Sequence, residues 1–356
     1  MRYLQLDWSG ASGAARYLLT LATLGVGLVV GGVLVGVVLG IAGATIDPDA
    51  TSTAVTPDAL GVPPLLFFVI ALVPFVVLFF VLWGCLRVLH RRPLRSLVSP
   101  DRVDSARLVH AGAAWGGLML ATTLAAMALD PGSYRFVFEP VAFLQLAGVA
   151  LLLIPIQAST EELLMRGYLM QGLARWTRSG WIALVSTSLL FGALHGMNTE
   201  VAVHGALLTM PYYIGFGLLM GGMTLVDDGL ELALGIHIAN NLFGTVLVTS
   251  PESSLPTPAL VRAESAALSA GSLLLWFVTA GAFVLLMARR YNWTWAAFAN
   301  ALGRVEPPEN AHDAAAPDAA APETPRATGD QALQNSSPRL PTSDDEASPE
   351  ANQAGA

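Results

Sequence analysis

Several ionisable side chains stand inside long apolar runs of the sequence. They are Glu161, Glu162, Arg166, His195, His204 and His237, and the amides Asn240 and Asn241 lie beside the last of them. Ionisable groups within lipid are costly, usually face the interior of a helix bundle and are functional candidates by default. Carboxylates, imidazoles and amides in one place could activate a water molecule and stabilise the oxyanion that forms when this water attacks a carbonyl.

The two glutamates are expected to have different roles. Adjacent residues on a helix point about 100° apart, so Glu161 and Glu162 cannot face one partner. Glu162 precedes Arg166 by four residues, the favourable order for an ion pair on a helix, and we predict a structural pair there. Glu161 is left as the free carboxylate and is the candidate general base. The alternative interpretation places both glutamates at a helix end in the headgroup region.

His195 closes an apolar run in which Phe191 lies one turn earlier on the same face. A turn is expected near Arg178, which is 17 residues from both Glu161 and His195. An antiparallel hairpin would therefore bring these two side chains to the same depth, where they could share a water molecule. The alternative is a packed or interfacial histidine.

His237 and Asn241 are four residues apart and therefore share one helix face, from which Asn240 points about 60° away. Neutral donors of this kind stabilise an oxyanion. The alternative is a hydrogen bond between packed helices. We expect His204 to be interfacial and place His90, His110 and His312 in a loop, at a span end and in the tail.

The elements that must position these residues are membrane helices. Only 12% of the 356 residues are charged, the hydrophobic share is 54% and mean hydropathy is +0.58, whereas soluble domains carry about 25% charged residues. A bilayer span needs about 20 apolar residues in a helix. The sequence predicts an all-α polytopic membrane helix bundle of about eight transmembrane helices, at 16–44, 62–89, 108–129, 140–160, 180–197, 203–226, 229–249 and 265–288.

Charge placement predicts the orientation of these spans. Six arginines follow the second run, at 87, 91, 92, 95, 102 and 107, whereas the connection before that run holds Asp47, Asp49 and Asp58 and no basic residue. Arginine-rich loops stay cytoplasmic, so both termini are expected in the cytoplasm of a multi-pass integral membrane protein, in the cell membrane if the chain is prokaryotic. The first run is read as a retained span. The acidic loop at Asp227, Asp228 and Glu231 offers no support.

Composition also divides the chain. Residues 1–139 hold the first membrane helices, 251–303 the last span and an interfacial aromatic segment, and 304–356 an acidic tail expected to be disordered. A docking role for that tail is an alternative. The single cysteine, Cys85, excludes a disulfide framework. Glycines at four-residue spacing, among them Gly217 and Gly221, are expected to let helices of the same chain approach closely. Pro155 is expected to break or kink the long helix that begins near residue 140.

Taken together, the motifs Glu-Glu-x-x-x-Arg (161–166), Phe-x-x-x-His (191–195) and His-x-x-x-Asn (237–241) resemble the CPBP family of intramembrane proteases. That family includes the type II CAAX prenyl endopeptidases and the Abi-type proteins. The resemblance covers residues 140–250. It implies an endopeptidase that cleaves a membrane-associated or prenylated-type substrate, in which Glu161 and His195 activate the hydrolytic water. It further implies that His237 and Asn241 bind the scissile carbonyl.

The cofactor and two rival functions stay open. Glu161, His195 and His237 would make a three-ligand zinc set, which the sequence allows without requiring it, because no His-Glu-x-x-His motif occurs. A catalytically inactive scaffold or immunity-type binding protein of the same family is the alternative function. A transporter would call for inverted repeats, which we do not find. The expected partners are a peptide or membrane-protein substrate and the bilayer, without nucleic acid; the oligomeric state is not predicted.

Overall fold

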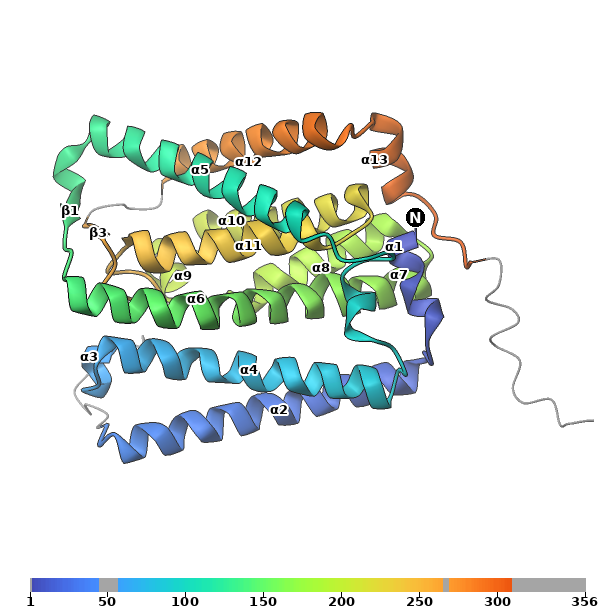
Figure 1. Cartoon of the computed structure of the whole chain (residues 1–356), viewed down its shortest axis with the longest axis horizontal. Coiled ribbons are helices and arrows are strands. Elements are labelled where there is room, and N and C mark those ends of the chain that lie inside the picture. Colours follow the sequence, from blue (N-terminus) through green and yellow to red (C-terminus); the bar gives the residue numbers. More distant parts are fainter. Residues whose placement is uncertain (1, 45–56, 265–268, 309–356) are drawn as a thin grey trace, which may run out of the picture. The chain divides into compact units, whose positions relative to one another are not determined.

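A computed structural model describes residues 2–44, 57–264 and 269–308, which belong to a compact unit spanning Met1–Ala311. A second unit, His312–Ala356, and with it His312 and the predicted tail from residue 309 onward, lies outside the described residues. The start of the predicted disordered tail at residue 304 was wrong, because Val305 is 4% exposed and its backbone N–H donates to the Arg178 carbonyl oxygen. The long helices lie lengthwise beside one another (Figure 1). They are α2 (Ala14–Ile41), α4 (Pro64–Val88), α5 (Ser105–Leu129), α6 (Pro140–Glu162), α8 (Gly180–Leu194), α10 (Ala206–Asp227), α11 (Glu231–Leu242) and α12 (Ala270–Tyr291).

The remaining described elements are short. They are α1 (Arg2–Gln5), η1 (Leu6–Ser9), α3 (Pro57–Leu60), η2 (Leu94–Leu97), η3 (Pro131–Ser133), β1 (Tyr134–Phe136), η4 (Leu163–Met170), α7 (Gln171–Thr177), α9 (Thr199–His204), η5 (Phe243–Leu247), β2 (Val248–Thr249), β3 (Val261–Ala263) and α13 (Trp295–Leu302). The strands form a small sheet in the order β1-β3-β2, which the sequence did not predict. Strand β3 is antiparallel to β1 and parallel to β2.

The predicted all-α polytopic bundle is confirmed. Within the described part of the chain, six helices are long and apolar enough to cross a membrane: α2, α4, α5, α10, α12 and the continuous helix Pro140–Thr177. The other two predicted spans correspond to α8, with 15 residues, and α11, with 12 residues. Every residue of α11 from Glu231 to His237 is buried. Helix α11 continues directly into the π-helical turn η5, Phe243–Leu247.

The helix that carries the two glutamates differs from the prediction. It runs without a break from Pro140 through Pro155 to Thr177, so of the predicted break or kink at Pro155 the break is excluded. The irregularity lies further along, in the π-helical turn Leu163–Met170 that follows Glu162 directly. Single π-turns inside α-helices frequently occur at functional sites. Here the turn changes the rotation of the helix between Glu162 and the residues that follow.

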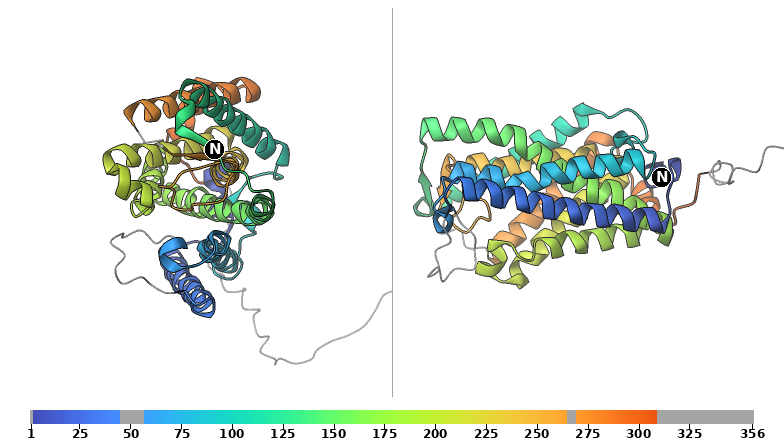
Figure 2. Two further views of the ribbon diagram at one scale, coloured as in Figure 1. Left: turned by 90° about the vertical axis from the view of Figure 1, so that its left-hand side faces the viewer. Right: turned by 90° about the horizontal axis from the view of Figure 1, so that it is seen from below.

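Glycines let the helices around the site approach closely. A Cβ on Gly217 of α10 would lie 3.0 Å from the Cα of Ser188 in α8, and one on Gly235 of α11 would collide with the carbonyl oxygen of Leu108 in α5. Gly31 likewise faces Pro74, where α2 packs on α4 along one edge of the bundle (Figures 1 and 2). The predicted packing within one chain is confirmed at these positions.

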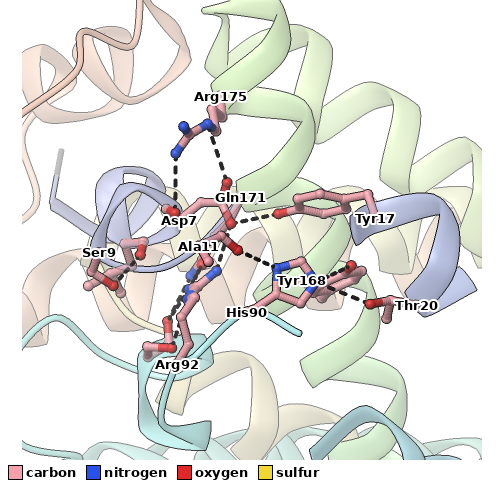
Figure 3. Close-up of polar contacts among 12 residues, drawn as sticks. Asp7, Ser9, Ala11, Tyr17, Thr20, His90, Arg92, Tyr168, Gln171 and Arg175 are labelled. Atoms are coloured by element: carbon pink, nitrogen blue, oxygen red, sulfur yellow. Dashed lines mark hydrogen bonds and ion pairs between the residues drawn. The ribbon is translucent and has the colours of Figure 1, made fainter. Parts of the chain in front are cut away.

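A buried polar cluster fastens the N-terminal segment to the end of the bundle where α7 ends (Figure 3). The Asp7 carboxylate, which is fully buried, accepts hydrogen bonds from Arg92 Nη1 at 2.7 Å and Tyr17 Oη at 2.6 Å. Arg92 Nη2 donates to Gln171 Oε1 at 2.6 Å. His90, expected simply as a loop residue, is also fully buried in this cluster.

The arginine-rich connection, the N-terminal segment and residues 304–306 meet at the same end of the bundle. Gln5 Nε2 donates to the carbonyl oxygen of Glu306 at 2.9 Å. The acidic loop that did not support the predicted orientation is neutralised here, because Asp227 pairs with Arg107 and Asp228 with Arg2. Because these aspartates are paired with arginines, they give no reason to place this loop on the opposite side of the membrane from the arginine-rich connection.

Candidate functional site

Most of the candidate residues line one cavity. Its volume is about 920 Å³, and its polar wall includes Glu161, His195 and Asn241, with Gln157 and Tyr213 beside them. Its apolar wall is formed by side chains of α2, α4, α6 and α8, among them Leu24, Leu72, Ile154 and Leu194. The cavity therefore joins a group of titratable and amide side chains to a long apolar surface, the combination expected of a small-molecule or peptide site.

Glu162 is buried behind this wall, where its carboxylate contacts both Arg166 and His237. Its Oε1 accepts a hydrogen bond from Arg166 Nη1 at 2.8 Å and lies 2.7 Å from His237 Nδ1. Arg166 also donates to the carbonyl oxygen of Gly217 at 3.2 Å and lies 4.6 Å from the centre of the Phe191 ring. The structure thus has the predicted Glu162–Arg166 pair, and it adds His237 to this pair.

Glu161 faces the cavity and is held by an amide, not by an arginine. Gln157, one turn earlier on the same helix, donates to Glu161 Oε1 at 2.6 Å. Glu161 Oε2 lies 3.6 Å from His237 Nε2 and is buried without a hydrogen-bond partner within the described residues. Within the described residues Glu161 forms no ion pair with an arginine, and its carboxylate lines the cavity, as the predicted general base requires.

His195 is held in one tautomer by the helix that it terminates. Its Nδ1 lies 2.7 Å from the carbonyl oxygen of Phe191, which can only accept, so Nδ1 carries the proton and Nε2 has the lone pair. The imidazole stacks on Tyr213 with ring centres 4.5 Å apart. Asn198 in turn donates to the Tyr213 hydroxyl at 3.0 Å. The ring is therefore held by a hydrogen bond at Nδ1 and by the stacking contact with Tyr213.

The hairpin predicted from the sequence is present. Helix α7 ends at Thr177, Arg178 adopts the left-handed conformation with φ of 56°, and α8 begins at Gly180. This geometry returns the chain antiparallel to α6, and it brings Glu161 and His195 to the same cavity. Because both side chains line the same cavity, a water molecule shared by Glu161 and His195 stays a prediction that fits this arrangement.

Asn241 and His237 lie on neighbouring positions of one helix face, but they contact different groups. Asn241 Nδ2 donates to Gln157 Oε1 at 2.9 Å, and its Oδ1 accepts from Asn240 Nδ2 at 3.2 Å. His237 has only 3% of its side chain exposed and contacts both glutamates. Asn241 lines the cavity and His237 lies against the buried side of the glutamates.

Sequence reasoning missed several residues of this site. Gln157 could have been found, because it precedes Glu161 by four residues within an apolar run. Tyr213 and Trp115 gave no signal, since aromatic residues are common in membrane spans. His204, expected to be interfacial, pairs with Glu252 at 2.9 Å in the wall of the cavity. Trp115, Gln157, His204 and Tyr213 come from α5, α6, α9 and α10.

The proposed zinc ligands do not fit a metal site in this arrangement. Across residues 2–44, 57–264 and 269–308, no three His, Cys, Asp or Glu side chains converge in a way that could hold a metal ion. Glu161 and His195 line the cavity, whereas His237 lies behind its wall against Glu162. We therefore derive the chemistry of this site from the side chains alone.

Comparisons with known proteins agree with the motifs. Residues 142–243 match the family model of the Rce1-like type II CAAX prenyl endopeptidases, a stretch that contains all seven predicted site residues. The uncharacterized protein YyaK of Bacillus subtilis (strain 168) is 34% identical over 173 residues, which cover 48% of this chain and 58% of YyaK. No solved structure matches the chain. Residues 142–243 are therefore similar to the Rce1-like type II CAAX prenyl endopeptidases, and the chain spans less than two thirds of the length of YyaK.

Proposed function

We propose that this protein is an intramembrane endopeptidase that hydrolyses a peptide bond of a membrane-associated or prenylated-type substrate. The observation that carries the proposal is that Glu161 and His195 line one cavity in complementary states. The Glu161 carboxylate has no arginine partner, and His195 presents the lone pair of Nε2 because Nδ1 is bound to the Phe191 carbonyl. A catalytically inactive family member is the competing interpretation.

In the proposed reaction, a water molecule lies between the Glu161 carboxylate and His195 Nε2. Glu161 takes one proton while the water oxygen bonds to the scissile carbonyl carbon, so that the carbonyl oxygen becomes an oxyanion. The C–N bond then breaks, and the leaving nitrogen receives the proton that Glu161 accepted. The products are a carboxylic acid and an amine, which become a carboxylate and an ammonium ion when the proton of the acid passes to the amine, and the side chains return to their starting states.

The oxyanion is stabilised by a donor on α11 in this proposal. Asn241 supplies an amide N–H from the cavity wall. His237, the second donor implied by the motif, lies behind the cavity wall with Nε2 3.6 Å from Glu161 Oε2, so Asn241 is the donor that the cavity presents. Loss of one oxyanion donor costs about 100- to 1,000-fold in kcat in a well-studied protease. Asn241→Leu is expected to lower turnover within that range.

The test uses purified full-length protein in nanodiscs with a library of prenylated and unprenylated peptides and membrane proteins. Wild type is expected to cleave part of this library, and Glu161→Gln to cleave none of it. Glu139→Gln is the matched control, since Glu139 is an exposed glutamate that precedes the same helix. No product from folded wild type would support the inactive interpretation.

A parallel sample with a metal chelator addresses zinc. We expect cleavage to persist, because the three named ligands are not gathered for a metal in the described structure. Activity that disappears with chelator and returns with added zinc would overturn the side-chain mechanism while leaving the protease proposal intact.

A further inference from the structure

The cavity wall contains a chain of four side-chain hydrogen bonds that starts outside the segment matched by the family model. Trp115 Nε1 on α5 donates to Asn240 Oδ1 at 3.3 Å, and Asn240 Nδ2 donates to Asn241 Oδ1 at 3.2 Å. Asn241 Nδ2 donates to Gln157 Oε1 at 2.9 Å. Gln157 Nε2 donates to Glu161 Oε1 at 2.6 Å. We name these five residues the amide relay.

All four bonds run in the same direction, and the ends of the relay explain why. An indole N–H can only donate, and an ionised carboxylate can only accept. The three amides between them can donate from nitrogen and accept at oxygen, so one orientation satisfies the whole series. If Asn241 were flipped, its oxygen would face Gln157 Oε1 and its nitrogen would face Asn240 Nδ2. Trp115 therefore selects the orientation of Asn241 from two bonds away.

That orientation matters to the reaction proposed above. Each amide nitrogen has two hydrogens, and the relay uses one hydrogen of Asn241 Nδ2. The second is left to donate to a substrate carbonyl. With the opposite orientation, Asn241 would bring a carbonyl oxygen toward the developing oxyanion, which would repel it. The relay also restrains Glu161 through a short charge-assisted bond from Gln157.

We propose that Trp115 and Gln157 are positioning residues, which hold the Asn241 amide with its N–H toward the scissile carbonyl and hold the Glu161 carboxylate against the attacking water. This inference rests on the proposed endopeptidase function. Neither residue touches the reacting atoms in the proposed reaction. Trp115 lies on α5, outside residues 142–243, so the site extends beyond the family segment.

The hydrogen-bond donor of Trp115 can be removed while most of its aromatic packing is kept. The side chain is 1% exposed and packs edge-on against Phe283, with ring centres 5.4 Å apart. Trp115→Phe removes the N–H and keeps an aromatic ring in that contact. The matched control is Trp276→Phe, because Trp276 Nε1 is buried without a hydrogen-bond partner within the described residues. For Gln157→Met, the control is Gln145→Met, an exposed glutamine on the same helix.

The first experiment measures kcat and KM of full-length protein in nanodiscs on a substrate found in the library. Trp115→Phe and Gln157→Met are each expected to lower kcat about tenfold, equivalent to about 1.4 kcal/mol of barrier, with KM changed less than twofold. Because one relay is broken in both, the double variant is expected to lose no more than the larger single effect. Unchanged kcat in both single variants, or fully multiplicative losses, would overturn the inference.

The outcomes separate this inference from the protease proposal. If Glu161→Gln abolishes cleavage while both relay variants match their controls, the endopeptidase stands and the relay has no positioning role. If wild type cleaves nothing, a second measurement decides the relay. In protein with ¹⁵N-labelled tryptophan, the indole proton resonance of Trp115, identified by its loss in Trp115→Phe, is expected to move in Glu161→Gln and in Gln157→Met. An unmoved resonance in both variants would overturn the relay.

Discussion

His237 Nδ1 lies 2.7 Å from Oε1 of Glu162, the same oxygen that accepts the hydrogen bond from Arg166. That single oxygen therefore meets both the Arg166 guanidinium and the His237 imidazole, which come from different helices. The buried side of the site is thus a coupled group of one carboxylate, one guanidinium and one imidazole. The contribution of this buried group to the stability of the fold and the role of Glu161 in the reaction can be tested with separate variants.

Removing the charge of Glu162 is expected to destabilise the protein strongly. Glu162→Gln leaves the guanidinium of Arg166 buried without its counter-charge, which costs about 3–5 kcal/mol. Glu161→Gln removes no ion pair with an arginine and is expected to change stability much less, although it abolishes cleavage. Thermal unfolding of both variants in the same detergent tests this difference. Equal unfolding temperatures would show that the Glu162–Arg166 pair does not stabilise the fold.

The N-terminal cluster offers a comparison of buried and exposed ion pairs. Asp7→Asn is expected to cost about 3–5 kcal/mol, because the fully buried Arg92 loses its counter-charge. Asp101→Asn breaks the pair with Arg2, whose two side chains are 64% and 62% exposed, and is expected to cost less than about 1 kcal/mol. Chemical or thermal unfolding in detergent measures both. A larger effect at Asp101 would contradict the assignment of Asp7 as the anchor of this segment.

The α5–α11 contact is expected to reject a single methyl group. A Cβ on Gly235 would meet the Leu108 carbonyl oxygen, so Gly235→Ala must separate the helices and is expected to cost about 1–3 kcal/mol. Gly222→Ala is the control, because a Cβ there has nothing within 4 Å in the described structure. We expect Gly222→Ala to unfold at or above the wild-type temperature. A tolerated alanine at 235 would mean that the helices are not in close contact there.

Stability is expected to fall as the pH is lowered below about 6.5, in part through His90. Burial lowers the pKa of His90 from its ordinary value of 6.5, with the positive charge of Arg92 acting in the same direction and Asp7 opposing both. Because the unfolded chain binds this proton more readily, the contribution of His90 is complete above pH 6.5 and is lost as the pH falls toward the lowered value.

Unfolding temperatures at pH 7.5 and 5.5 test this assignment. The decrease on acidification is expected to be smaller in His90→Asn than in wild type, whereas His110→Asn is expected to keep the full decrease, because His110 is exposed. An identical pH dependence in wild type and His90→Asn would show that His90 does not contribute.

Local features of the candidate site could be predicted from the sequence. The ion pair of Glu162 with Arg166 and the shared face of His237 and Asn241 depend on a four-residue spacing, which a helix converts directly into proximity. Glu161 and His195 are each 17 residues from Arg178, so a hairpin that turns at Arg178 brings them to the same depth. The membrane helices themselves follow from the length of the apolar runs, because lipid requires every backbone polar group to be bonded within its own segment.

Tertiary structure alone decided which of these faces meet. The partners of His237 and Asn241 lie 75 and 84 residues away in the chain, at Glu162 and Gln157, and Trp115 lies 125 residues from Asn240. Such contacts depend on the rotation of each helix about its axis and on how closely glycines let the helices approach. In an apolar span, hydrophobic periodicity carries little information about rotation, since lipid-facing and buried positions are both apolar.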